Sequence, residues 1–299
     1  MPKFSEDTLN NWTNPPSDNE EAKLSNAGRM VKDAINSDVK LKSKGIEIFG
    51  QGSYANNTNI RLNSDIDINV HYADAFYFHL PDGLKKEDVG LNNSVDYSFS
   101  EYKNDVENAL VSKFGRNDVK RKNKCITVVG NSYRVQVDLV PTWEHRWYFS
   151  QKTYNEGVVL FADNSSFTQI VNYPKQHIEN GKTKNSNTLR RFKSLVRIFK
   201  MAKVKMEDDK YFSDNKITSF LLESLVWNVP NNIFTNYSTW NERTKQVIIF
   251  LYNNTKEDIQ CKDWCEVSNL LYLFHAERKW TFQEVNTYFV KMWNYMGYN

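Results

Sequence analysis

The chain of 299 residues has few cysteines and no long uninterrupted apolar segment. Its three cysteines are an odd number without the spacing of a disulfide framework, which favours a reducing compartment. No apolar run approaches the length of a membrane span, and the N-terminus lacks the charged-then-apolar pattern of a signal peptide. These absences predict a soluble cytoplasmic protein without membrane insertion.

The sequence also lacks a strong excess of charge, since its formal net charge is only +3. The hydrophobic share of 40% is enough for a real core, and the aromatic share of 14% requires that several aromatic side chains be partly exposed. No repeat or low-complexity tract is present. A chain of this length is expected to form one large domain or two packed ones.

The first part of the chain mixes helical and strand patterns. A loose N-terminal arm is expected over 1–16, and Ser17 with Glu20 is a capping box that begins a helix running to about Leu41. The other expected elements are a strand at 46–49, a strand around 65–70, an irregular stretch over 72–97, a helix over 98–114, and strands over 125–129 and 133–139, the last ended by Pro141.

From about residue 174 the pattern becomes helical. Helices are predicted over 174–180, 187–205, 215–228, 239–253 and 281–294. The change of pattern predicts two domains, a mixed catalytic part at 1–170 and a helical part at 171–299.

Acidic residues lie on the polar faces of two predicted strands. Residues i and i+2 of a strand point the same way, so Asp65 and Asp67 share a face. Two such carboxylates repel each other unless a proton or cation lies between them, and hard oxygen ligands suit Mg²⁺. Asp138 lies on the polar face of the alternating strand 133–139. If the two strands are neighbours, three carboxylates converge on one or two Mg²⁺ ions.

A glycine-serine turn, Gln51-Gly52-Ser53, precedes the first acidic strand by about a dozen residues. Backbone N–H groups and a hydroxyl in such a turn can bind phosphate oxygens.

The order of Gly52-Ser53, Asp65-Ile66-Asp67 and the distant Asp138 resembles the polymerase-β-like nucleotidyltransferase superfamily. Over about residues 45–141, the stretch from Gly52 to Thr58 and the stretch from Val135 to Pro141 look like the CD-NTases, bacterial relatives of cyclic GMP–AMP synthase. The resemblance implies an α+β fold, with a polymerase-β-like nucleotidyltransferase core of mixed sheet and flanking helices. A long N-terminal brace helix and a C-terminal helical domain that closes the nucleotide pocket complete the implied fold.

The resemblance also implies an activity. The expected enzyme uses Mg²⁺, with Mn²⁺ as an alternative, to join ATP, GTP or UTP into a cyclic dinucleotide or cyclic oligonucleotide, and it releases pyrophosphate. The product would be read by a separate effector in anti-phage signalling, and no nucleic-acid activator is expected. Two other classes compete with this reading: a nucleotidyltransferase that modifies RNA or protein, and a catalytically silent nucleotide- or RNA-binding protein.

A basic stripe follows one side of the predicted helix at 187–205. It consists of Arg190, Lys193, Arg197 and Lys200. In the family that the chain resembles, a lysine on this helix contacts the donor phosphates, so Lys193 or Lys200, helped by Arg197, is expected to bind nucleotide. Ser219 resembles a phosphate-contacting serine, with a plain N-cap serine as the alternative.

Three further groups of residues suggest less specific roles. Asn172 can read a pyrimidine edge and Tyr173 can stack on a base, because the resembled family has its nucleobase pocket here. The basic run 113–124 suits nucleic acid, although a solvated surface is the commoner outcome. Cys261, Cys265 and His275 permit zinc, but a fourth ligand is not evident and buried cysteines are the favoured interpretation.

Overall fold

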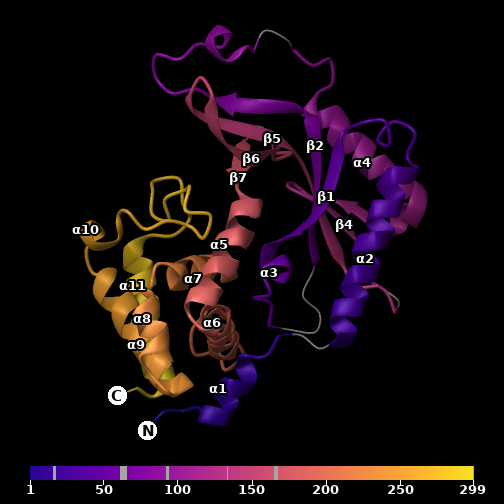
Figure 1. Cartoon of the computed structure of the whole chain (residues 1–299). Coiled ribbons are helices and arrows are strands. Elements are labelled where there is room, and N and C mark those ends of the chain that lie inside the picture. Colours follow the sequence, from indigo (N-terminus) through magenta and orange to yellow (C-terminus); the bar gives the residue numbers. More distant parts are fainter. Residues whose placement is uncertain (16–17, 61–65, 92–93, 133, 165–167, 299) are drawn as a thin grey trace. The chain divides into compact units, whose positions relative to one another are not determined.

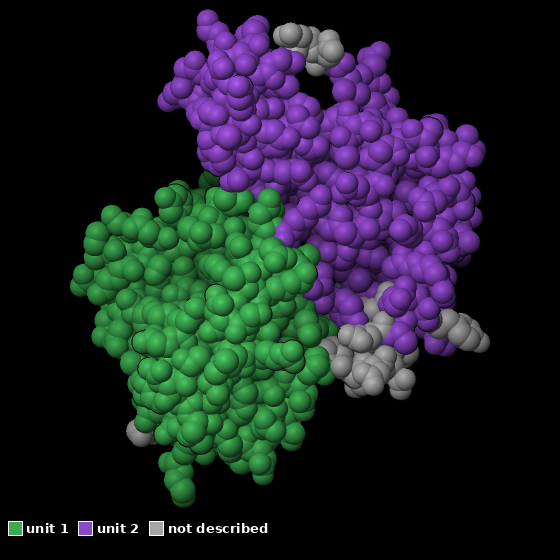
Figure 2. All heavy atoms as spheres, in the orientation of Figure 1, with its two compact units in different colours: residues 1–16, 56–61, 176–299 green, residues 17–55, 62–175 purple. Residues whose placement is uncertain are grey.

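The computed structural model describes all residues except 16–17, 61–65, 92–93, 133, 165–167 and 299. Its contacts divide the chain into two compact units, coloured in Figure 2. The sheet unit comprises residues 17–55 and 62–175, and the helical unit comprises residues 1–16, 56–61 and 176–299. The helical unit therefore includes two N-terminal pieces that the predicted partition at residue 170 assigns to the catalytic part.

The sheet unit is built on seven strands (Figure 1). Their order is β1-β2-β5-β4-β3, and β6 and β7 extend the sheet from β5. The strands are β1 (Ile46–Gln51), β2 (Ile66–His79), β3 (Val119–Arg121), β4 (Ile126–Val128), β5 (Val137–Ser150), β6 (Thr153–Phe161) and β7 (Gln169–Asn172). Only the β2–β5 pair is parallel among the described pairs; the other five are antiparallel.

Two helices lie together on one face of this sheet, α2 (Asp18–Ser37) and α4 (Phe99–Phe114) (Figure 1). Apolar residues of both helices and of the strands form one buried cluster. Helix α4 begins with a capping box, in which Ser98 and Glu101 satisfy each other's backbone N–H groups. The short elements of the unit are α3 (Gly52–Ala55), η1 (Glu87–Val89) and η2 (Arg116–Asp118).

The two central strands are longer than the sequence predicts. The stretch 72–97 is not irregular throughout, because β2 continues to His79. The prediction that Pro141 ends its strand is also wrong, since β5 runs on to Ser150. Pro141 pairs with Val70 in the parallel ladder. A proline lacks only its own N–H donor, so a strand can continue through it where that donor is not needed.

The helical unit packs around α6 (Arg191–Asp208), whose apolar stripe is fully buried. The five predicted helices are present, as α5 (Pro174–Asn187), α6, α7 (Ser219–Trp227), α9 (Trp240–Asn254) and α11 (Phe282–Met296); α8 (Asn231–Thr235) and α10 (Asp258–Cys261) were not predicted. The first two residues of α5 belong to the sheet unit. No helix among the described residues is long and apolar enough to cross a bilayer.

The N-terminal arm is not loose, contrary to the prediction. It contains helix α1 (Glu6–Trp12), capped by the hydroxyl of Ser5, and the side chain of Leu9 is fully buried. The carboxylate of Glu6 accepts hydrogen bonds from the first backbone N–H groups of α9. A carboxylate is favourable at a helix N-terminus, so α1 is fixed to the helical unit by charge as well as by packing. The capping box predicted at Ser17 and Glu20 lies outside the described residues and side chains.

The predicted helix at 187–205 is interrupted at its beginning. Leu189 and Arg190 have φ values of 52° and 63°, in the left-handed region, so α5 ends before α6 begins. Arg190 is consequently the N-cap residue of α6 and is not part of its basic stripe.

A buried ion pair holds Thr58 inside the helical unit. The Lys200 ammonium, in a side chain only 2% exposed, donates to Glu223 at 2.8 Å, to the Thr58 hydroxyl at 2.9 Å and to the Thr58 carbonyl at 3.2 Å. Glu223 also accepts from the Thr58 hydroxyl and meets the His177 ring nitrogen at 3.1 Å. Arg197 donates to the carbonyls of Thr13 and Asn57. The basic stripe of α6 therefore binds the chain itself at these two positions.

We predict that Lys200→Met lowers the free energy of unfolding by about 3–5 kcal/mol, because it leaves the Glu223 carboxylate buried without its cation. Urea denaturation followed by circular dichroism measures this loss. Lys205→Met on the same helix is the matched control, since its ion pair with Asp208 is long at 3.8 Å and exposed. Equal losses in both variants contradict the assignment.

Candidate active site

One row of directly paired residues crosses four neighbouring strands of the sheet. Gln51 of β1 pairs with Asp67 of β2, Asp67 pairs with Asp138 of β5, and Asp138 pairs with Thr127 of β4. Residues paired directly across strands project from the same face of a sheet. The condition stated from the sequence, that the two acidic strands be neighbours, is met: β2 pairs with β5, and Asp67 is in register with Asp138. Asp65 lies outside the described residues.

The glycine-serine turn lies directly against the first of these carboxylates. Gly52 has a φ of +70°, and a Cβ atom built on it would lie 2.2 Å from Oδ2 of Asp67. The turn and Asp67 therefore approach each other more closely than any side chain at position 52 would allow. Ser53 follows within the one-turn helix α3.

Asp138 is held by residues that precede β5 in the chain. The Thr127 hydroxyl donates to Oδ1 of Asp138 at 2.5 Å, and the Lys122 ammonium lies 3.4 Å from both carboxylate oxygens. Burial and the charge of Asp138 raise the pKa of the Cys125 thiol to about 11, so this thiol stays protonated. Sequence reasoning missed Thr127 and Lys122 as site residues. The signal for Thr127 was a lone polar residue between the apolar Ile126 and Val128.

A chain of side-chain hydrogen bonds runs from Gln51, next to the turn, into the sheet. The Asn69 amide donates to the side-chain carbonyl of Gln51 at 2.9 Å, and Asn69 in turn accepts from the Thr142 hydroxyl at 2.6 Å. Thr142 contacts a ring nitrogen of His71 at 3.3 Å. Burial, followed by the charge of Lys175, lowers the pKa of His71, which keeps its ring neutral. Because its carbonyl is engaged, the Gln51 side chain is oriented with its NH₂ group as the remaining donor.

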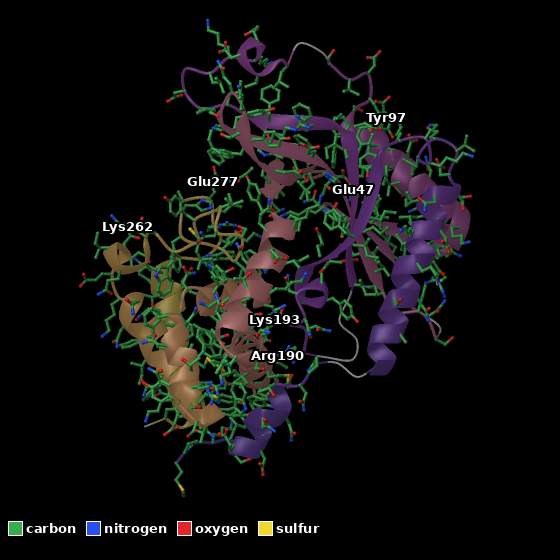
Figure 3. All side chains as sticks on the ribbon, in the orientation of Figure 1. Glu47, Tyr97, Arg190, Lys193, Lys262 and Glu277 are labelled. Carbon is green, nitrogen blue, oxygen red and sulfur yellow. The ribbon has the colours of Figure 1, made fainter. Side chains whose placement is uncertain are left out.

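The nucleotide-binding candidates of the helical unit have different environments. Lys200 and Arg197 are engaged with protein groups as described above, so nucleotide contacts from them stay predictions. Lys193, labelled in Figure 3, is 9% exposed, and burial lowers the pKa of its ammonium. No hydrogen-bond or ion-pair partner of this ammonium occurs in the described part of the chain. Ser219 is the first residue of α7 and is exposed, while Thr218 is the N-cap, so the N-cap alternative for Ser219 is wrong.

The two base-contact candidates also differ. Asn172 is exposed at the end of β7, where it pairs with Val158. Tyr173 is 4% exposed, and its ring packs so close to Gly157 that a Cβ atom there would meet it at 2.7 Å. Burial raises the pKa of Tyr173 to about 12. Its ring is thus part of the interior and is not available for stacking on a base.

The remaining candidates are the basic run 113–124 and the three possible zinc ligands. In the basic run 113–124, Arg116 and Arg121 pair with Glu107, and Lys122 pairs with Asp138. These pairs consume much of the positive charge that nucleic acid would need. Among the described residues no three histidine, cysteine or acidic side chains are arranged to hold a metal, so the zinc alternative for Cys261, Cys265 and His275 is unsupported.

The carboxylate row itself fits a hard divalent cation. Asp67 and Asp138 present oxygen donors from one face of two paired strands, and the Lys122 ammonium already lies beside Asp138. Carboxylate oxygens are the donors that Mg²⁺ takes from proteins, usually together with substrate phosphates.

Comparisons with known proteins agree with this geometry. Residues 179–297 match the family described as the cGAS/DncV-like nucleotidyltransferase C-terminal helical domain. The cyclic dipyrimidine nucleotide synthase CdnE of Cecembia lonarensis is 58% identical over 298 residues, which cover 100% of both chains. The cyclic dipurine nucleotide synthase of Elizabethkingia meningoseptica is 38% identical, over 99% of both chains.

Two solved structures are similar to this chain over nearly its whole length. The Elizabethkingia meningoseptica CdnE cyclic dinucleotide synthase with GTP and Apcpp has a TM-score of 0.81 at 35% identity and covers 99% of this chain and 100% of its own. The Rhodothermus marinus CdnE c-UMP-AMP synthase with Apcpp and Upnpp has a TM-score of 0.86 at 26% identity, over 99% and 98%. These likenesses confirm the predicted α+β nucleotidyltransferase fold with its C-terminal helical domain. The chain belongs to the CD-NTase family of cGAS/DncV-like nucleotidyltransferases, within the group of CdnE cyclic dinucleotide synthases.

Proposed function

We propose that this enzyme joins two pyrimidine nucleoside triphosphates into a cyclic dinucleotide with Mg²⁺ and releases pyrophosphate. The observation that carries the metal-dependent chemistry is the in-register pair of Asp67 and Asp138 beside the Gly52 turn. The pyrimidine preference rests on the name of the 58% identical relative from Cecembia lonarensis. A second relative with the same name, from Legionella pneumophila, is 35% identical.

The residues of the proposed site would have separate tasks. Asp65, Asp67 and Asp138 would hold the metal ions. When bound, Mg²⁺ neutralises triphosphate charge and lowers the pKa of the attacking ribose hydroxyl. Gly52 lets the turn approach the phosphates, and the backbone N–H groups and hydroxyl at Ser53 would bind them. Gln51 would donate its NH₂ group to a phosphate oxygen, because its carbonyl already accepts from Asn69.

In the helical unit we propose Lys193 and Ser219 as phosphate ligands. Lys193 carries a partly desolvated ammonium, and a cation with little water around it interacts more strongly with a phosphate than a solvated one. Ser219 presents an exposed hydroxyl at the first position of α7. Lys200 and Arg197 would support them by holding the segment 56–61.

The cellular role follows from the product class. We propose that the cyclic dinucleotide is a second messenger in bacterial anti-phage defence, read by a separate effector, and that the enzyme works in the cytoplasm. The three cysteines, Cys125, Cys261 and Cys265, are all free thiols, as expected in a reducing compartment.

We predict that Asp67→Asn lowers cyclic dinucleotide formation more than 100-fold, since even indirect partners of a metal change activity by about 10–100-fold. Labelled nucleotides with Mg²⁺, followed by phosphatase treatment and mass spectrometry, measure the product. Unchanged thermal melting of the variant would show that the fold is intact. Near-normal synthesis by Asp67→Asn contradicts the proposed site, and label transferred only to RNA or protein contradicts the proposed reaction.

We predict that the wild-type enzyme, offered ATP, GTP, CTP and UTP together, releases mainly a cyclic dipyrimidine product.

Asn172→Ala should lower the ratio of pyrimidine to purine product about 10-fold, because it removes the amide that can pair with a pyrimidine edge. The matched control is Gln169→Ala at the other end of β7, which should leave the ratio unchanged. Mass spectrometry of the products gives both ratios. A mainly dipurine product contradicts the base assignment.

We predict that Gly52→Ala lowers activity about 100-fold, because the new methyl group must displace the Asp67 carboxylate. Gly50→Ala, two residues earlier in β1, is the control, since its Cβ would make only an ordinary 3.5 Å contact with Ala55. Initial rates under saturating nucleotide compare the two variants. If both variants lose activity equally, the close approach of the turn to Asp67 is not the cause of the loss.

A further inference from the structure

Asp138, the second carboxylate of the row, has its own supporting residues, which lie on β4 and on the turn between β3 and β4. Thr127 is 3% exposed and pairs directly with Asp138 across the β4–β5 ladder. Its hydroxyl reaches Oδ1 of Asp138 at 2.5 Å. A β-branched threonine on a strand has few rotamers, so this hydroxyl is fixed in direction. The contact therefore limits the rotation of the Asp138 carboxylate about its own side-chain bond.

The second group near Asp138 is a cation of the protein itself. The Lys122 ammonium lies 3.4 Å from both oxygens of Asp138, and the Lys122 side chain is 49% exposed. An exposed lysine on a flexible stem can leave such a position at small cost. Unlike Thr127, it lies at 3.4 Å from both oxygens and so would compete with another cation for this carboxylate.

The backbone next to Lys122 is fixed by a hydrogen bond from helix α4. The Lys103 ammonium of α4 is in a side chain 1% exposed and donates to the Asn123 carbonyl at 2.9 Å. Lys103 also pairs with Asp163 at 3.0 Å, and Asp163 accepts two hydrogen bonds from Arg121. The turn is thus fixed by the buried Lys103 ammonium and by the ion pairs of Asp163, while the end of the Lys122 side chain is half-exposed.

We propose that Thr127 is a positioning residue that orients Asp138 toward the divalent cation, and that Lys122 is the resident counter-cation which the divalent cation displaces. The inference rests on the proposed metal-binding role of Asp138. The two residues act on the same carboxylate with opposite effects on metal affinity. Removing the hydroxyl frees Asp138 to rotate, whereas removing the ammonium takes away a competitor.

The test measures the binding of Mn²⁺ alone to the full-length, nucleotide-free protein. Electron paramagnetic resonance detects the unbound Mn²⁺. Thr127→Val should weaken Mn²⁺ binding about 10-fold, the lower end of what outer partners of a metal usually contribute. Thr127→Ser restores the hydroxyl and should bind within about 2-fold of wild type. Lys122→Met should bind Mn²⁺ more tightly than wild type, about 2-fold or more, as expected for a lost competing charge near a surface.

Controls separate this inference from the proposed function. Lys124→Met removes a neighbouring exposed charge that does not contact Asp138 in any described hydrogen bond or ion pair, and it should leave Mn²⁺ affinity near the wild-type value. Asp138→Asn must lower the affinity or the number of bound ions. If it does not, the metal-binding role of Asp138 fails. If Asp138→Asn loses Mn²⁺ while Thr127→Val binds like wild type, only the role of Thr127 fails.

A second measurement covers the case in which Thr127→Val does not fold, with Thr127→Ala as the replacement variant. The Thr127 variants should need a higher Mg²⁺ concentration to reach half-maximal turnover. At saturating Mg²⁺ their rates should return to near the wild-type rate. Lys122→Met should reach half-maximal rate at lower Mg²⁺. If the Thr127 variants have a lower maximal rate but reach half of it at the wild-type Mg²⁺ concentration, the positioning role is overturned. If Lys122→Met needs as much Mg²⁺ as wild type, or more, to reach half-maximal rate, the counter-cation role is overturned.

Discussion

The parallel pairing of β2 with β5 is the constraint on which the site depends. It sets Asp67 directly beside Asp138, although 71 positions separate them in the chain, and it leaves both on one face. A slip of one residue in either strand would turn its carboxylate into the apolar cluster that α2 and α4 cover. The alternating buried residues Ile66, Ile68 and Val70 prevent that slip, because it would expose them. The core of the sheet unit thus fixes the strand register that sets Asp67 beside Asp138.

The helical unit contributes to the same region of the chain by a different means. The segment that joins the Gly52 turn to the acidic strand carries Thr58, which is buried with Lys200 and Glu223 in the helical unit. Burial raises the pKa of Glu223, but the charge of Lys200 and the bond from His177 outweigh it, and the pKa falls well below its usual range. The carboxylate therefore stays ionised at neutral pH and keeps the segment attached. In the chain, this segment follows Gly52 and precedes Asp67.

The sequence predicted those parts of the molecule that depend on local patterns. The alternation around Asp67 and Asp138 identified both strands, and the helical spacing identified α4 and the main helices of the second half. What failed depends on distant partners. Helix α1 is stable because Leu9 is buried and Glu6 caps α9, and neither partner is visible from residues 1–16. Likewise, the ion pair of Lys200 with Glu223 was not foreseen, because Glu223 lies 23 positions away and on another helix.

The row of Gln51, Asp67, Asp138 and Thr127 also bears on the stability cost of the proposed active site. Two carboxylates on adjacent strands repel each other, and such a pair costs stability unless opposite charge or hydrogen bonds compensate. Lys122 supplies charge that can leave, and Thr127 supplies a hydrogen bond that stays. A buried, permanent cation in place of Lys122 would have to be desolvated and would compete more strongly with the proposed divalent cation. An exposed lysine at 3.4 Å is therefore a suitable compromise between a stable fold and an open site.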